Sequence, residues 1–124
     1  MKTEMTVTET TYAEMVNALV KDPREILRDL QPDAVNLLHM AVGISDEAGE
    51  VLGLVKKVVI NGGVYNRKEL VKELGDIEFY LEGLRQETGI TRKEVLLANI
   101  EKLADRYTGF VYSDEASRRR KDVK

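Results

Sequence analysis

Two short acidic motifs constrain this sequence more than any other feature. Glu47 and Glu50 form the first pair, Glu73 and Asp76 form the second, and the two carboxylates of each pair are three residues apart. In a helix, residues at that spacing lie on one face with Cβ atoms about 5–6 Å apart. Two such helices side by side would bring all four carboxylates into one small volume.

Four like charges in one volume require a bound cation or raised pKa values. Oxygen ligands are those that Mg²⁺ and Mn²⁺ prefer, and sites for these ions usually leave positions for water and phosphate oxygens. The two motifs together therefore predict a helical enzyme of phosphate chemistry that depends on Mg²⁺, with Mn²⁺ as the alternative ion. Either pair alone would be more typical of a solvated helix face.

Helical periodicity of the apolar residues predicts an all-α fold. We expect a short helical turn at 24–30 and four main helices, at about 11–20, 34–60, 67–88 and 92–107. Side-chain oxygens that satisfy the free N–H groups of a first turn mark where helices begin. We expect such N-caps at Asp33 and Asn66, and capping boxes at Thr11–Glu14 and Thr91–Glu94.

Each expected helix carries an apolar stripe that should form the core. These stripes comprise Tyr12, Met15, Val16 and Leu19; Leu37, Ala41, Ile44, Ala48, Val51, Val55 and Val59; Leu70, Leu74, Ile77, Leu81 and Leu84; and Val95, Leu96, Ile100 and Leu103. Glu78, Glu82 and Arg85 are expected to face solvent. Gly43 lies before the first acidic pair and Gly49 within it, and the two glycines suggest close approach by a neighbouring helix or ligand.

Short connections between the helices predict a bundle of four main helices. Because the helices are long and their stripes are separated, we expect a second chain to complete the core, in a homodimer or a homotetramer. The sequence predicts a single domain over residues 1–112, followed by a polar, basic tail at 113–124.

Composition excludes several classes of function. The sequence has no Cys, which excludes disulfides, thiol catalysis and thiolate zinc sites, and one histidine, His39, cannot build a His-rich zinc site. A net charge of −3 argues against a dedicated nucleic-acid binder. No apolar run approaches the ~20 residues of a membrane span. The N-terminus lacks the apolar core of a signal peptide, so a cytoplasmic location is expected.

A row of polar and basic residues is expected on one face of the last main helix. Asn99, Lys102 and Arg106 stand at positions i, i+3 and i+7. An amide, an ammonium and a guanidinium group in one row would suit a polyphosphate. Lys57 follows Glu50 by seven residues, so we expect it on the same side of its helix, two turns later.

The paired motif resembles the signature of the MazG-like all-α nucleotide pyrophosphohydrolases. The resemblance rests on Glu47-x-x-Glu50, then 22 residues, then Glu73-x-x-Asp76, and on the surrounding segments 46–51, 72–77 and 99–107. It covers about residues 33–107. Asp46 departs from the pattern, since many relatives have Glu or a neutral residue there, which leaves its part in a metal site open.

The resemblance implies an enzyme that cleaves a nucleoside triphosphate between the α- and β-phosphates, giving a monophosphate and pyrophosphate. Glu47, Glu50, Glu73 and Asp76 would be the Mg²⁺ ligands. Glu47 or Glu50 would also accept the proton of the attacking water. The candidates for phosphate contact would be Lys57, Asn99, Lys102 and Arg106, with Lys102 foremost. The base would be read by the N-terminal helix, by Asn36 or His39, or by a partner chain.

Other readings of the sequence stay open. An enzyme of the same architecture could act on deoxyuridine or deoxycytidine triphosphate, phosphoribosyl-ATP or guanosine tetraphosphate, and a substrate panel distinguishes these. A non-catalytic helical dimerisation or antitoxin-like module would show no thermal stabilisation by Mg²⁺, whereas a ligand of the folded state must stabilise it. A bundle that stores Ca²⁺ or Mg²⁺ would have no need of the row on the last main helix.

Overall fold

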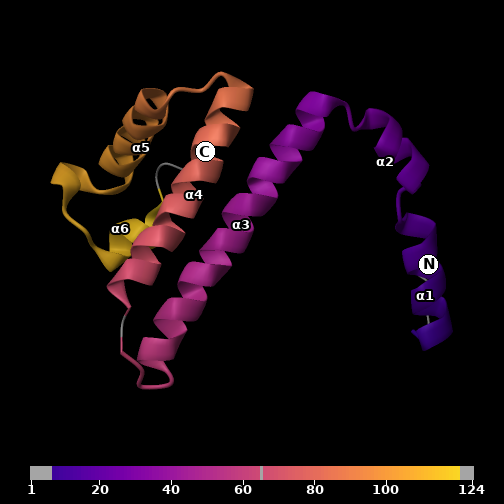
Figure 1. Ribbon diagram of the computed structural model, residues 1–124, viewed down its shortest axis with the longest axis horizontal. Coiled ribbons are helices and arrows are strands. Elements are labelled where there is room, and N and C mark those ends of the chain that lie inside the picture. The colour runs from indigo at the N-terminus through magenta and orange to yellow at the C-terminus, as the bar shows by residue number, and fades with distance from the viewer. Residues whose placement is uncertain (1–6, 65, 121–124) are drawn as a thin grey trace. The chain divides into compact units, whose positions relative to one another are not determined.

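The computed structural model describes residues 7–64 and 66–120, and their fold is built of helices. The elements in order are α1 (Glu9–Leu19), α2 (Pro23–Asp29), α3 (Pro32–Val59), α4 (Arg67–Thr88), α5 (Arg92–Arg106), the 3₁₀ helix η1 (Thr108–Phe110) and α6 (Asp114–Arg119) (Figure 1). No strand occurs in these two ranges, and the predicted all-α fold is confirmed. Among the described helices, none combines the length and apolar character needed to cross a membrane.

The chain divides into two compact units, of which the second begins at Asn36. The first unit contains α1, α2 and the first turn of α3. The second contains the rest of α3 and the chain from α4 to α6. The expected single domain over 1–112 stays a prediction. Residues 1–6, which lack the apolar core of a signal peptide, and residues 121–124 of the basic tail lie outside the described residues.

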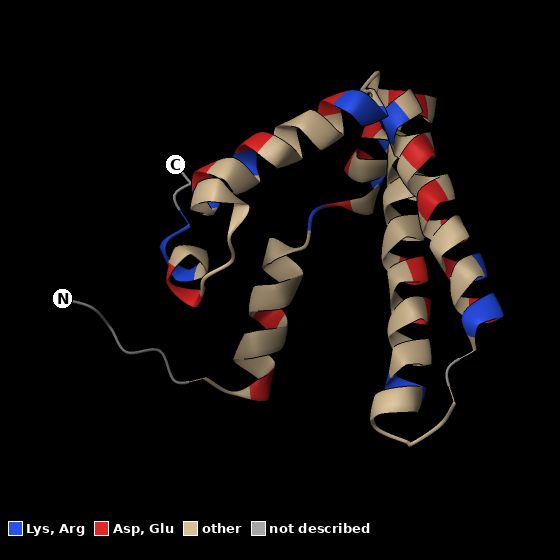
Figure 2. Ribbon diagram, turned by 90° about the vertical axis from the view of Figure 1, so that its left-hand side faces the viewer, with Lys and Arg blue, Asp and Glu red and all other residues tan. Residues whose placement is uncertain are grey.

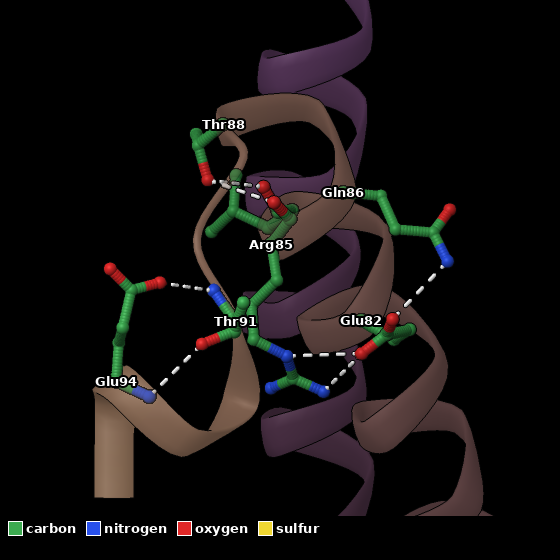
Figure 3. Close-up of polar contacts among 7 residues, drawn as sticks. Glu82, Arg85, Gln86, Thr88, Thr91 and Glu94 are labelled. Carbon is green, nitrogen blue, oxygen red and sulfur yellow. Dashed lines mark hydrogen bonds and ion pairs between the residues drawn. The ribbon is translucent and has the colours of Figure 1, made fainter. Parts of the chain in front are cut away.

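Local capping chemistry sets the bounds of α4 and α5 as predicted. The side chain of Asn66 accepts a hydrogen bond from the Glu69 N–H at 3.2 Å. Thr91 and Glu94 form the reciprocal capping box, with distances of 3.1 and 2.7 Å (Figure 3). Gly89 ends α4 in the left-handed conformation at φ 71°, which glycine adopts without steric cost.

Two predicted helix starts are wrong. The first capping box uses Thr8 and Thr11, not Thr11 and Glu14, and α1 begins at Glu9. The Thr8 hydroxyl accepts from the Thr11 N–H at 3.1 Å, so an acceptor three residues upstream takes the role expected of Thr11. The helix α3 begins at Pro32 rather than after Asp33, because proline at a first helical position has no N–H to satisfy.

The predicted tail contains a further short helix. Ser113 caps α6 by accepting from the Ala116 N–H at 3.0 Å, and Ala116 is buried. Six residues of the segment expected to be polar tail are therefore helical.

The helices α3 and α4 form an antiparallel hairpin (Figures 1 and 2). Asn36 near the start of α3 is hydrogen-bonded to Glu87 near the end of α4. Further along, Met40 lies against Gly83, and Gly43 lies against Tyr80. These contacts fix the register of the two helices over several turns.

Close approach in this hairpin depends on two glycines. A Cβ atom at Gly43 would overlap the ring of Tyr80, and one at Gly83 would overlap the sulfur of Met40. The close approach expected at Gly43 is thus confirmed. At Gly49 a Cβ atom would meet nothing within 4 Å of the described chain.

Most of the expected core stripes are not buried within the described chain, so that prediction is wrong for a single chain. Met40 and Ala116 are the buried apolar side chains among the described residues. Members of the stripes remain exposed, for example Val59 at 75% and Ile100 at 52%. Apolar faces of this extent typically mark interaction surfaces. The stripes are more exposed than predicted because one hairpin cannot cover both faces of its own helices.

The glycine contacts generate a first prediction. Gly43→Ala should lower the free energy of unfolding, because overpacking against Tyr80, at about 1–3 kcal/mol, exceeds the ~1 kcal/mol gain in helix propensity. Gly49→Ala is the matched control and should raise stability by up to about 1 kcal/mol. Urea unfolding measures both. A Gly43→Ala variant as stable as Gly49→Ala would contradict the close contact.

Candidate active site

Three of the four predicted metal ligands converge between α3 and α4. Glu47 comes from α3, and Glu73 and Asp76 come from α4. Each offers a carboxylate oxygen, and these oxygens lie within 4.8 Å of one another. Glu47 and Glu73 are partly buried and Asp76 is exposed. The hairpin register therefore joins the two motifs, which are separated by 22 residues in the sequence.

Glu50 lies outside this group. It is exposed on α3, one turn after Glu47. The acidic cluster is defined here as Glu47, Glu73 and Asp76. The role of Glu50 as a fourth ligand stays a prediction.

Repulsion among the carboxylates is visible in the protonation of Glu47. A hydrogen bond with Glu73 raises the pKa of Glu47 from its ordinary value of 4.5 to about 7, and desolvation and the charges of Asp76, Glu73 and Asp46 act in the same direction. A shared proton thus relieves part of the repulsion. A bound cation would relieve it in the same place.

The donor set of the acidic cluster fits a hard divalent ion. It consists of carboxylate oxygens, without sulfur or imidazole. Opposite ligands of one Mg²⁺ lie about 4 Å apart, from its short metal–oxygen distances. The three carboxylate oxygens lie within 4.8 Å of one another, which is close to that value. Small side-chain rotations would therefore suffice to bring all three oxygens into contact with one ion.

The predicted phosphate-contact residues lie elsewhere on the second unit. Lys57 is exposed in the last turn of α3, where its carbonyl accepts from the Gly63 N–H at 2.9 Å. Asn99, Lys102 and Arg106 lie on α5, with Asn99 and Lys102 exposed and Arg106 partly buried. Their contact with phosphate stays a prediction.

The two candidates for reading the base lie along α3. The Asn36 side-chain amide donates to Oε2 of Glu87 at 2.7 Å. The ring of His39 meets that of Tyr80 edge to face, with centroids 6.1 Å apart. Asn36 also lines a cavity of about 490 Å³ together with Met40, Phe79, Glu82, Gly83, Gln86 and Glu87. We call this the α3–α4 cavity.

The cavity residues of α4 were not predicted from the sequence. The expectation that Glu82 faces solvent is confirmed, since its side chain is 53% exposed where it lines the cavity. The same expectation is wrong for Arg85, whose side chain is only 13% exposed. Arg85 donates to Glu82 at 2.7 and 3.0 Å (Figure 3). For Glu87 the sequence does contain an indication of its position. It follows Asp76 by eleven residues, about three helical turns, and therefore lies on the same helix face as the acidic cluster.

The shared proton generates a prediction on pH. Because the folded-state pKa of Glu47 is raised, its contribution to stability is present below about pH 4.5 and is lost as the pH rises through about 7. Metal-free protein should therefore lose stability across this window, and Glu47→Gln should show a weaker loss. Thermal unfolding in EDTA, followed against pH, measures the difference.

The control for that experiment is Glu78→Gln, which removes an exposed carboxylate of α4 outside the acidic cluster. It should retain the pH dependence of the wild type. Parallel pH profiles for wild type and Glu47→Gln would contradict the shared proton.

Comparison with known proteins assigns the family. The model of the MazG nucleotide pyrophosphohydrolase domain matches residues 36–110, more than half of the chain. No curated protein and no solved structure matches the chain. The match includes the acidic cluster and the residues Asn99, Lys102 and Arg106, which we call the α5 row. It indicates nucleotide pyrophosphohydrolase activity, and proteins of this family are metal-dependent in general. The chain therefore belongs to the MazG nucleotide pyrophosphohydrolase family.

Proposed function

We propose that this protein is a Mg²⁺-dependent hydrolase that cleaves a ribo- or deoxyribonucleoside triphosphate between the α- and β-phosphates, releasing monophosphate and pyrophosphate. The observation that carries the proposal is the convergence of Glu47, Glu73 and Asp76 from two helices within the region matched by the family. Mn²⁺ is the alternative ion.

Glu47, Glu73 and Asp76 would hold the ion, with Glu50 as the fourth ligand. A bound Mg²⁺ would screen the phosphate charge and orient the attacking water. The protein's own contribution is to hold these carboxylates close together although their charges repel one another. This repulsion contributes to the raised pKa of Glu47.

Glu47 or Glu50 accepts the proton of the attacking water. A general base must be ionised to accept a proton. Glu47 lies in the acidic cluster, where a bound cation would keep its carboxylate ionised, and this supports it as the base. Glu50, one turn along α3, is the alternative.

The basic residues stabilise charge that develops on the leaving pyrophosphate. Lys102 is the foremost candidate, and Arg106 can bind two phosphate oxygens through its planar guanidinium group. Asn99 adds a neutral donor on the same face of α5, and Lys57 adds a charge from α3.

The proposed assembly is a homodimer or a homotetramer. The exposed apolar stripes support this, because contiguous apolar surface is rarely left open to water. A second chain packed on the hairpin would cover residues such as Val59 and Leu74, which are 75% and 47% exposed.

Product analysis tests the reaction. Each nucleoside triphosphate is incubated with the purified protein and either Mg²⁺ or EDTA, and the products are separated. We expect monophosphate and pyrophosphate, in the presence of metal only. Diphosphate and phosphate would contradict the proposed cleavage position, and no turnover of any triphosphate would contradict the activity.

The metal site generates a separate prediction. Mg²⁺ at about 100 times its dissociation constant should stabilise the wild type by roughly 2.7 kcal/mol. Glu50→Gln should abolish this stabilisation while the far-UV circular dichroism stays helical. Glu78→Gln should respond to Mg²⁺ as the wild type does. Unchanged Mg²⁺ affinity in Glu50→Gln would exclude Glu50 as a ligand.

A further inference from the structure

We infer that the α3–α4 cavity binds the nucleobase of the substrate and selects bases that carry an exocyclic amino group. Guanine, adenine and cytosine carry this group, and uracil and thymine do not. The inference rests on the proposed function, because it concerns the other end of the same nucleotide.

The position of the cavity suits this role. Met40 precedes Glu47 by seven residues on α3, and Gly83 follows Asp76 by seven residues on α4. Met40 and Gly83 therefore lie on the same helix faces as Glu47 and Asp76. The cavity is about two turns, or roughly 10 Å, from the acidic cluster. A sugar and one phosphate span such a gap when the remaining phosphates lie at the acidic cluster.

The size and the apolar walls of the cavity suit a flat ring. Its volume of about 490 Å³ falls within the usual range for small-molecule sites. Phe79, a residue that is 66% exposed, lines the cavity. Its ring stands edge to face on the ring of Tyr80, with centroids 5.2 Å apart. Bases taken into protein pockets commonly stack on such side chains. Met40 adds a polarisable sulfur, for which Gly83 leaves room.

The polar groups of the cavity are mainly acceptors. One oxygen of Glu87 accepts from the Asn36 amide, which leaves the second oxygen of Glu87 and the Asn36 carbonyl oxygen for a ligand. The Gln86 amide donates to Glu82 at 3.2 Å, which leaves its own carbonyl oxygen as an acceptor. Glu82 itself is already engaged by Arg85 and Gln86.

A cavity rich in acceptors favours the donor edge of an amino-bearing base. Guanine offers two adjacent donor positions, and adenine and cytosine offer one amino group each. Uracil has one donor on this edge, its N3–H, with a carbonyl oxygen on either side. Those carbonyl oxygens would face the acceptor oxygens of the cavity without a hydrogen bond, and polar groups left unpaired cost binding. The negative charge of Glu87 also disfavours phosphate here, which orients the nucleotide with its phosphates toward the acidic cluster.

Kinetic comparison of four substrates tests the inference. We expect kcat/KM for GTP, ATP and CTP to exceed that for UTP by about tenfold or more, the size of one good base contact. Glu87→Gln should reduce this ratio, because its amide presents a donor to the carbonyl oxygens of uracil. Asn36→Ala removes the carbonyl acceptor of Asn36 and the hydrogen bond that holds Glu87 in place, so it should also reduce the ratio. Glu78→Gln, outside the cavity, should leave the ratio unchanged.

The outcomes separate the inference from the proposed function. Metal-dependent turnover with equal kcat/KM for all four substrates would overturn the inference and leave the function standing. A preference that survives both Glu87→Gln and Asn36→Ala would do the same. No turnover by the wild type of these four substrates or of their deoxyribonucleotide counterparts would contradict the proposed function, and the inference would fall with it.

Discussion

The close contact of α3 with α4 is the interaction on which the rest of the structure depends. Gly43 against Tyr80 and Gly83 against Met40 allow the two helices to approach closely, because at each contact only one of the two residues has a side chain. Because these contacts fix the register, they decide which carboxylates meet. A shift of the hairpin by one turn would separate Glu47 from Glu73, and the acidic cluster would not form. The same register brings together the residues that line the α3–α4 cavity. The proposed metal and base sites therefore both depend on one packing arrangement.

Electrostatics links this packing to chemistry. Gathering carboxylates costs free energy in a metal-free protein, and the raised pKa of Glu47 shows where that cost falls. The protein holds the carboxylates together nonetheless, because the helix contacts and not the charges determine their positions. Such a site gains from any divalent cation that enters it. The acidic cluster is therefore our proposed site for metal-bound phosphates, and the α5 row is the proposed source of positive charge.

The sequence predicted the local parts of this arrangement and not the non-local ones. The bounds of α4 and α5 follow from Asn66, Gly89 and Thr91, whose capping interactions reach only three or four residues along the chain. The acidic motifs were found because their spacing is itself local. Glu87 and the cavity were missed because they depend on the antiparallel register. The prediction that one chain buries its own apolar stripes was wrong, because periodicity identifies an apolar face but does not show which molecule covers it.

The central claim is that the hairpin register creates a divalent-cation site, and direct metal titration tests it most simply. Mn²⁺ binding would be followed by electron paramagnetic resonance without nucleotide, in wild type and in Glu73→Gln, with circular dichroism as a check on folding. We predict that the wild type binds Mn²⁺ and releases it to excess Mg²⁺. Glu73→Gln should lose affinity by at least the roughly 10–100-fold that is typical when a supporting group of a metal site is removed. Equal Mn²⁺ affinity in the two proteins would contradict the account.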